Sequence, residues 1–187
     1  MRFIKDDEFI RGNCPMTKED VRILSVAKLE LQEEYKVIDI GAGTGSVSIQ
    51  MSLICPKGKV IAIEKDEDAL AVLNQNKEKF KVSNLEIINA EAMEIQPSIQ
   101  EEFDAIFVGG SGGNIADIIE KYGEKLKKDK NIVLNFITLN NVYKAMEALK
   151  ALNYEVECVQ VQVSKTRGQS YMLMANNPIF IVTGKKR

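Results

Sequence analysis

The sequence predicts an α/β protein with a doubly wound, mostly parallel seven-stranded sheet that includes an antiparallel C-terminal strand. Three observations support this fold class. Short apolar runs alternate with amphipathic stretches along most of the 187 residues, and such alternation is typical of doubly wound sheets. The runs are continuously apolar, as parallel strands covered on both faces tend to be. Near the C-terminus two runs are separated only by turn-forming residues, which indicates an antiparallel pair.

Each element is expected from its own pattern. Helices are expected where apolar residues recur on one face, as Val47, Met51 and Ile54 do, and this face should lie in the core. Segments 154–165 and 177–184 are expected to form the antiparallel pair at the C-terminal edge. The parallel strands are expected at 36–41, 59–64, 85–90, 104–110 and 131–137.

Another helix is expected before the first strand. Thr17 and Asp20 have the spacing of a capping box, which predicts that the helix begins there. The buried face of this helix should comprise Val21, Leu24, Ala27 and Leu31.

A single domain covering 1–187 is expected, because the chain shows no repeat and no long linker. Its length is also sufficient to bury a core without disulfides or metals. The domain is expected to comprise an N-terminal segment and helix that contributes to the site (1–34), a ligand-binding core (35–152) and the C-terminal antiparallel strands (153–187).

The composition argues against several classes of function. A net charge of −2 gives no general attraction to nucleic acid or to an acidic membrane. Histidine is absent, so imidazole can be neither a base nor a metal ligand, and no metal site is expected. No apolar run approaches 18 residues and the first residues are charged, so we expect a cytoplasmic protein without a membrane partner.

A glycine-rich turn follows the first expected strand in the stretch "VIDIGAGTGSVSI". The dinucleotide fingerprint G-x-G-x-x-G does not fit, because its third glycine would fall on Ser46 or Ser48. Asp39, just before the turn, would repel a phosphate but could accept hydrogen bonds from an ammonium group. These features favour S-adenosylmethionine as the cofactor. The residues expected at its methionyl end are Asp39, Gly41, Ala42, Gly43, Thr44 and Gly45.

Acidic residues at the next two strand ends support the same ligand. Glu64 lies 23 residues after Gly41, where a carboxylate could bind the two ribose hydroxyls and reject a 2′-phosphate. Glu91 and Ala92 follow the third strand and could flank an adenine. The alternative is a glycine turn that binds no ligand.

The acceptor site is expected after the fourth strand, where four glycines could form an open floor for a large planar molecule. The alternative is a mobile turn before a helix capped by Asn114. The floor would comprise Gly109, Gly110, Ser111, Gly112 and Gly113. Arg11, Lys165 and Arg167 stand beside glycines in two other segments and could pair with acceptor carboxylates; alternatively, they are solvated loop charges.

Several stretches together closely resemble the precorrin methyltransferases of the decarboxylating carbon-15 type. The resemblance spans about residues 5–184. It rests on "EFIRGNCPMTKEDVR", "VIDIGAGTGSVSI", "FDAIFVGGSGGN", "KTRG" and "YMLMANNPIFIV". It implies a Rossmann-like class I methyltransferase fold and a stand-alone enzyme of anaerobic cobalamin biosynthesis.

The resemblance also implies a reaction and an assembly. Such enzymes methylate carbon-15 of cobalt-precorrin-6B and decarboxylate the ring C acetate, which gives cobalt-precorrin-7. Thr17 would contact the cofactor together with the glycine loop, Glu64 and Ala92, and the family assembles as homotetramers. The catalytic residue stays unknown, because a tyrosine, a carboxylic acid or water could protonate the decarboxylated carbon.

Two other functions remain open from the sequence. One is a tRNA adenine methyltransferase, against which the acidic chain and the missing basic stripe argue. The other is a non-catalytic protein that binds S-adenosylmethionine and turns nothing over.

Overall fold

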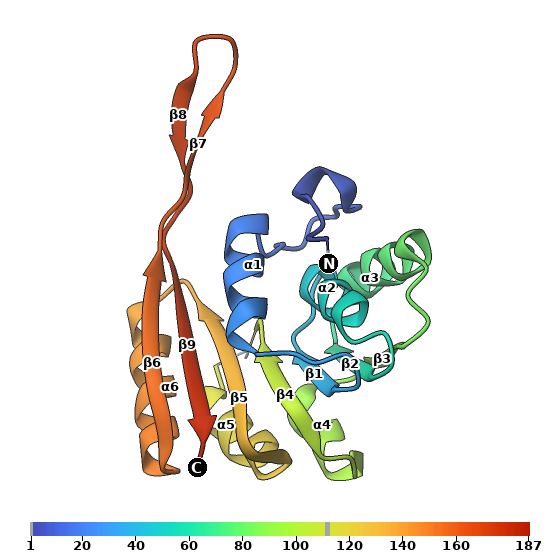
Figure 1. Ribbon diagram of the computed structural model, residues 1–187, viewed down its shortest axis with the longest axis vertical. Helices are drawn as coiled ribbons and strands as arrows, with labels where there is room; N and C mark the ends of the chain where they lie inside the picture. Colours follow the sequence, from blue (N-terminus) through green and yellow to red (C-terminus); the bar gives the residue numbers. More distant parts are fainter. Residues whose placement is uncertain (1, 111–112) are drawn as a thin grey trace.

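The computed structural model describes residues 2–110 and 113–187, and its centre is a seven-stranded sheet (Figure 1). The strands run in the order β3-β2-β1-β4-β5-β9-β6. Neighbours from β3 to β5 are parallel, whereas β9 is antiparallel to both β5 and β6. The predicted fold class is confirmed. The strands of this sheet are β1 (Lys36–Ile40), β2 (Lys59–Glu64), β3 (Leu85–Asn89), β4 (Phe103–Val108), β5 (Leu126–Phe136), β6 (Tyr154–Val161) and β9 (Ile179–Lys186).

Helices cover both faces of the sheet and create two cores. Side chains alternate along each strand, so that in β1 Ile38 packs with the core on one face and Val37 with the core on the other. One core lies under α1 (Glu19–Lys28), α2 (Ser46–Ile54) and α3 (Glu67–Phe80). The other lies under α4 (Ala92–Ile95), α5 (Ile115–Glu124) and α6 (Leu139–Ala151). Short 3₁₀ turns stand at η1 (Asp6–Glu8) and η2 (Gln96–Ser98). No helix within residues 2–110 and 113–187 is long and apolar enough to cross a membrane.

The strand β5 begins five residues earlier than its apolar run. Its first part, 126–130, is mostly charged, and the side chains of 127–129 are exposed. Lys127 Nζ pairs there with Asp104 Oδ1 of the neighbouring strand β4 at 2.7 Å. Because this part of the strand carries no apolar signal, only 131–137 could be expected from the sequence.

The C-terminal pair is confirmed, but the segment between its strands forms more structure than a turn. β7 (Ser164–Arg167) and β8 (Met172–Ala175) form a hairpin that extends well beyond the sheet (Figure 1). We call residues 164–175 the hairpin arm. Tyr171, Met172, Leu173 and Met174 are exposed apolar side chains of this arm.

The start and the buried face of α1 differ from the prediction. The capping-box interpretation is wrong, because Lys18 is the N-cap residue and makes no side-chain capping bond. Asp20 instead forms an ion pair with Lys165. Val21, Leu24 and Leu31 pack in the core as predicted. The inward face also includes the polar Arg22 and Ser25, whereas Ala27 is exposed. Arg22 and Ser25 can be buried because both find hydrogen-bond partners.

A buried carboxyl group lies beneath the turn between β1 and α2. Asp39 is 1 % exposed, its Oδ2 accepts a hydrogen bond from Ser48 Oγ of α2, and within the described residues its Oδ1 has no partner. Burial raises the pKa of Asp39 to about 7, and the charge of Glu64 acts in the same direction. The group therefore holds a proton in the folded protein over a pH range where it is ionised in the unfolded chain.

The variant Asp39→Asn should reveal this proton. In the unfolded chain Asp39 loses its proton near pH 4, whereas in the folded protein it keeps the proton up to about pH 7. The contribution of Asp39 to the free energy of unfolding is therefore full below about pH 4 and is lost as the pH rises to about 7. Asparagine has no such dependence. We expect the free energy of unfolding of the wild type minus that of the variant to fall between pH 4 and pH 7, measured by urea unfolding. A difference that stays constant over this range would show that Asp39 is ionised in the folded protein.

Candidate functional site

Two adjoining cavities lie at the carboxyl ends of the central strands. β1 has β2 on one side and β4 on the other, and the chain order reverses between β1 and β4. Ligands of doubly wound sheets bind at such a switch point. The first pocket measures about 490 Å³ and the second about 370 Å³, both within the usual range for small-molecule sites. The residues that line both pockets are Pro15, Gly41, Gly43 and Gly109.

The glycine loop after β1 forms part of the wall between the pockets. Gly41, Gly43 and Gly45 have φ angles of +72°, +56° and +76°, which favour glycine. A Cβ at Gly41 would stand 2.7 Å from the backbone oxygen of Gly110, and a Cβ at Gly45 would stand 2.0 Å from Leu73 Cδ1. The packing of the chain itself therefore requires glycine at 41 and 45, without any ligand.

Gly43 differs from its two neighbours. Among the described residues, a Cβ at this position would have only Pro15 O within 4 Å, at 3.4 Å. Gly43 therefore presents its backbone to the cavities. Ala42 and Thr44 line the second pocket beside it, whereas Gly45 lines neither pocket.

Glu64 connects the end of β2 to the glycine loop. Its Oε2 accepts a hydrogen bond from Gly43 N at 2.7 Å. Its Oε1 accepts hydrogen bonds from Lys65 N at 2.8 Å and Asp66 N at 3.0 Å. These three backbone donors hold the carboxylate in one orientation at the edge of the first pocket, where it can still accept a further hydrogen bond.

The end of β3 supplies the other predicted residues of the first pocket. Glu91 caps α4, since its Oε2 accepts hydrogen bonds from Met93 N at 2.6 Å and Glu94 N at 3.2 Å. Glu91 and Ala92 both line the first pocket, together with the apolar side chains of Ile63 and Ile118. This end of the pocket therefore combines an apolar wall with a fixed carboxylate.

The N-terminal segment 13–18 borders both pockets. Asn13 and Cys14 line the first pocket, and Thr17 and Lys18 line the second. This segment lies beside the glycine loop, since a Cβ built on Gly43 would stand 3.4 Å from Pro15 O. Of these residues, only Thr17 was expected at the site from the sequence.

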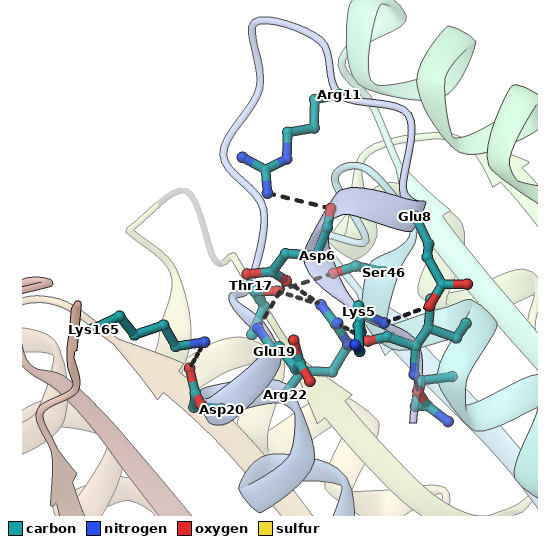
Figure 2. Close-up of polar contacts among 12 residues, drawn as sticks. Lys5, Asp6, Glu8, Arg11, Thr17, Glu19, Asp20, Arg22, Ser46 and Lys165 are labelled. Atoms are coloured by element: carbon teal, nitrogen blue, oxygen red, sulfur yellow. Dashed lines mark hydrogen bonds and ion pairs between the residues drawn. The ribbon is translucent and has the colours of Figure 1, made fainter. Parts of the chain in front are cut away.

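Arg22 of α1 holds this segment in place (Figure 2). Its side chain is 0 % exposed. Nη1 donates to Thr17 O at 2.7 Å and to Asp6 Oδ1 at 3.2 Å, and Nη2 donates to Ile4 O at 2.5 Å. The guanidinium also lies 4.8 Å from the centre of the Phe9 ring. A buried guanidinium with several partners is costly to disrupt, so residues 4–18 form a firm wall.

The second pocket is mainly apolar and has three amide side chains. Its apolar residues include Phe107 of β4, Phe136 at the end of β5 and Ile179 of β9. The amides are Asn135, Asn176 and Asn177. The side chain of Asn135 is held in place by α1, because its Nδ2 donates to Ser25 Oγ at 2.9 Å. Such a cavity suits a large apolar ligand with polar substituents.

Some residues expected at the site line neither pocket. Arg11 is exposed and donates to Asp6 O at 3.2 Å, and Arg167 is exposed on the hairpin arm. Asp39 lies buried beneath the loop. Lys165 lines neither pocket, but it forms an ion pair with Asp20, which lines the second.

Only part of the glycine floor expected after β4 lines the pockets. Gly109 lines both pockets and Gly110 the first, whereas Gly113 is exposed before α5 and lines neither. Ser111 and Gly112 lie outside the described residues. A Cβ at Gly109 would stand 2.9 Å from Gly41 O, so the ends of β1 and β4 meet backbone against backbone.

Asn135, Asn176 and Asn177 were not expected at the site from the sequence. Asn135 had a usable signal, because it stands at the carboxyl end of a strand and such ends meet at one edge of a parallel sheet. Asn176 and Asn177 fall within the stretch "YMLMANNPIFIV" that carries the family resemblance, but no local pattern assigns them to a pocket. They reach the pocket only because β9 returns between β5 and β6.

Comparisons with known proteins agree with this architecture. Residues 8–186 match the family model described as the precorrin methyltransferase domain. A relative from Sulfurisphaera tokodaii, named probable cobalt-precorrin-6B C(15)-methyltransferase (decarboxylating), is 42 % identical over 98 % of this chain and 97 % of its own. A relative from Salmonella typhimurium, named cobalt-precorrin-6B C(15)-methyltransferase (decarboxylating), is 38 % identical over 98 % of this chain and 96 % of its own.

A solved structure extends the likeness to three dimensions. The crystal structure of precorrin-6y C5,15-methyltransferase from Geobacter metallireducens GS-15 superposes with a TM-score of 0.93. The two chains are 38 % identical, and the match covers 99 % of this chain and 97 % of the other. The chain therefore belongs to the precorrin methyltransferase family.

Proposed function

We propose that the protein methylates carbon-15 of cobalt-precorrin-6B with S-adenosylmethionine and decarboxylates the ring C acetate, which gives cobalt-precorrin-7 in anaerobic cobalamin biosynthesis. The observation that carries this proposal is the pair of pockets that share Gly41, Gly43 and Gly109. A methyl donor in one pocket would meet an acceptor in the other across this backbone. The names of the two curated relatives support the choice of acceptor.

The first pocket fits the cofactor. Glu64 would accept hydrogen bonds from the ribose hydroxyls, and Glu91 and Ala92 would flank the adenine. The backbone at Gly41 and Gly43 would lie against the methionyl part, since no side chain fills the space beside Gly43. S-adenosylmethionine supplies an electrophilic methyl group on a positively charged sulfonium. Asp39 and Gly45 would support the loop from beneath, whereas Thr17, Ala42 and Thr44 would face the side of the acceptor.

The second pocket fits the acceptor. Apolar walls from Phe107, Phe136 and Ile179 suit the faces of a macrocycle. The amides of Asn135, Asn176 and Asn177 and the ammonium of Lys18 suit its carboxylate and carbonyl substituents. Gly109 offers a surface without a side chain where the two ligands would approach each other.

The reaction requires alignment more than a strong base. Carbon-15 of an electron-rich tetrapyrrole is itself nucleophilic, so methyl transfer depends on positioning and exclusion of water. This agrees with a chain that lacks histidine. Decarboxylation breaks the bond between the acetate methylene and its carboxylate. The electron pair passes into the conjugated macrocycle, and a proton is then added to the methylene carbon. None of the described residues that line the second pocket is a tyrosine, which favours a carboxyl group or water as the donor.

The assembly is proposed to be a cytoplasmic homotetramer that binds no nucleic acid. The hairpin arm carries Tyr171, Met172 and Leu173 at 76 %, 58 % and 67 % exposure. Adjacent exposed apolar side chains of this kind mark interaction surfaces. The net charge of −2 offers no general attraction to nucleic acid.

The reaction can be tested by mass spectrometry of purified protein with S-adenosylmethionine and cobalt-precorrin-6B. We expect the product to gain one methyl group and lose one carbon dioxide. Binding of the cofactor without any product would favour a non-catalytic binding protein. Methylation of tRNA instead would favour the nucleic-acid enzyme.

The variant Glu64→Ala should weaken cofactor binding by roughly 1–3 kcal/mol, because a charge-assisted hydrogen bond to the ribose is lost. Titration calorimetry with S-adenosylhomocysteine measures the effect. Glu102→Ala is a suitable control, since Glu102 is exposed and lines neither pocket. Unchanged affinity in Glu64→Ala would mean that another residue holds the ribose.

If the hairpin arms meet at the contact between subunits, the variant Leu173→Glu should dissociate the tetramer, because a charge would be buried there. Sedimentation velocity should show a smaller species while circular dichroism shows a folded chain. Leu53→Glu serves as the control, since Leu53 is also exposed but lies on α2. A tetramer that persists in Leu173→Glu would place the interface elsewhere.

A further inference from the structure

An ion pair bridges one side of the second pocket. Asp20 of α1 lines this pocket, and its Oδ2 lies 2.6 Å from Nζ of Lys165 in β7. Figure 2 shows the two side chains reaching toward each other from α1 and from the hairpin arm. Lys165 stands two residues beyond Val163, which also lines the pocket. The pair therefore joins two walls of the cavity at its rim.

This pair can be exchanged at little cost. The side chains of Lys165 and Asp20 are 51 % and 36 % exposed, and ion pairs that are partly exposed contribute little to stability. Asp20 Oδ2 itself is buried and, apart from this ion pair, makes no hydrogen bond within the described residues, so water must reach this atom when the lysine leaves. Lysine carries its charge on a flexible stem, so the ammonium can move to another acceptor while the backbone stays in place.

The lysine stays charged in this environment. The bond to Asp20 raises the pKa of Lys165 above its ordinary value, and the charges of Glu19 and Asp6 act in the same direction. Its ammonium can therefore form an ion pair with another anion. Lys18 lines the same pocket, so a carboxylate that enters there meets a positive charge even before Lys165 moves.

We propose that Lys165 exchanges Asp20 for a carboxylate of the acceptor, so that Asp20 acts as an internal competitor that occupies the lysine until a carboxylated ligand arrives. This inference rests on the proposed function, because the acceptor must carry carboxylates. An apolar molecule that enters the pocket would not displace Asp20 from the lysine. The pair would thus favour acceptors whose carboxylate reaches the rim.

A second ion pair provides a matched control. Lys28 of α1 pairs with Glu157 of β6, so this pair also joins α1 to the C-terminal strands. Neither residue lines the first or the second pocket. Removal of the Lys28 charge should loosen the same two parts of the fold without changing the rim.

The test is a set of binding measurements on the full-length protein with S-adenosylhomocysteine bound. Calorimetry gives the Kd of cobalt-precorrin-6B for the wild type, Lys165→Met, Asp20→Asn, the double variant and Lys28→Met. We expect Lys165→Met to raise this Kd and Asp20→Asn to lower it, each about two- to fivefold, the range of one partly exposed ion pair. The double variant should match Lys165→Met, since Asp20 has nothing to compete for once the lysine is gone. Lys28→Met and the affinity for S-adenosylhomocysteine should not change.

A derivative of the acceptor with esterified carboxylates gives a second readout. Its Kd should be the same for the wild type and Lys165→Met, because no carboxylate can take the lysine. A purely structural role of Lys165 would weaken both ligands equally.

Three results would overturn the proposal. If Asp20→Asn raises the Kd as Lys165→Met does, the pair only supports the rim. If the effects of the two changes add in the double variant, the residues act independently. If neither change differs from Lys28→Met although the wild type binds cobalt-precorrin-6B, the exchange is excluded while the proposed function stands. A wild type that does not bind this acceptor at all would overturn both.

Discussion

The direct backbone contact between the ends of β1 and β4 is the constraint on which the site depends. Gly41 and Gly109 must both lack side chains there, because each faces the main chain of the other loop at less than 3 Å from where a Cβ would stand. This contact brings two strand ends close at the point where the chain order reverses. It leaves a thin wall of main chain with a cavity on either side. A wall made of side chains would separate a donor from an acceptor.

Two polar anchors keep the surroundings of this wall rigid. Glu64 fixes the glycine loop through the amide of Gly43, and Arg22 fixes the N-terminal segment through the carbonyl of Thr17. Each anchor uses a polar side chain that forms at least two hydrogen bonds with backbone atoms. A site arranged in advance in this way loses little freedom when a ligand binds, which suits a reaction that depends mainly on alignment.

The sequence reveals the first pocket better than the second, and the reason is topological. The glycine loop, Glu64 and Ala92 all follow strand ends, and parallel strand ends share one edge of a sheet, so their meeting could be predicted. The second pocket is built from the N-terminal segment, the end of β5 and the base of the hairpin arm. Their meeting depends on the insertion of β9 between β5 and β6, which no local pattern encodes. The buried face of α1 was predicted only in part for a similar reason. Arg22 and Ser25 belong to it although they are polar, because their burial depends on distant partners such as Ile4 and Asn135.

The base of the hairpin arm adjoins the second pocket, whereas its far end is exposed. Its base continues from Val163 and returns through Asn176, both in the wall of the second pocket, and Asn176 N donates to Val163 O at 2.9 Å. Its far end carries the exposed apolar side chains. Paired strands form a stiff element. A protein that binds the far end of the hairpin arm would therefore also restrain the wall of the second pocket at its base. Self-association and ligand capture would then be thermodynamically linked, and dilution of the protein would weaken its hold on the macrocycle.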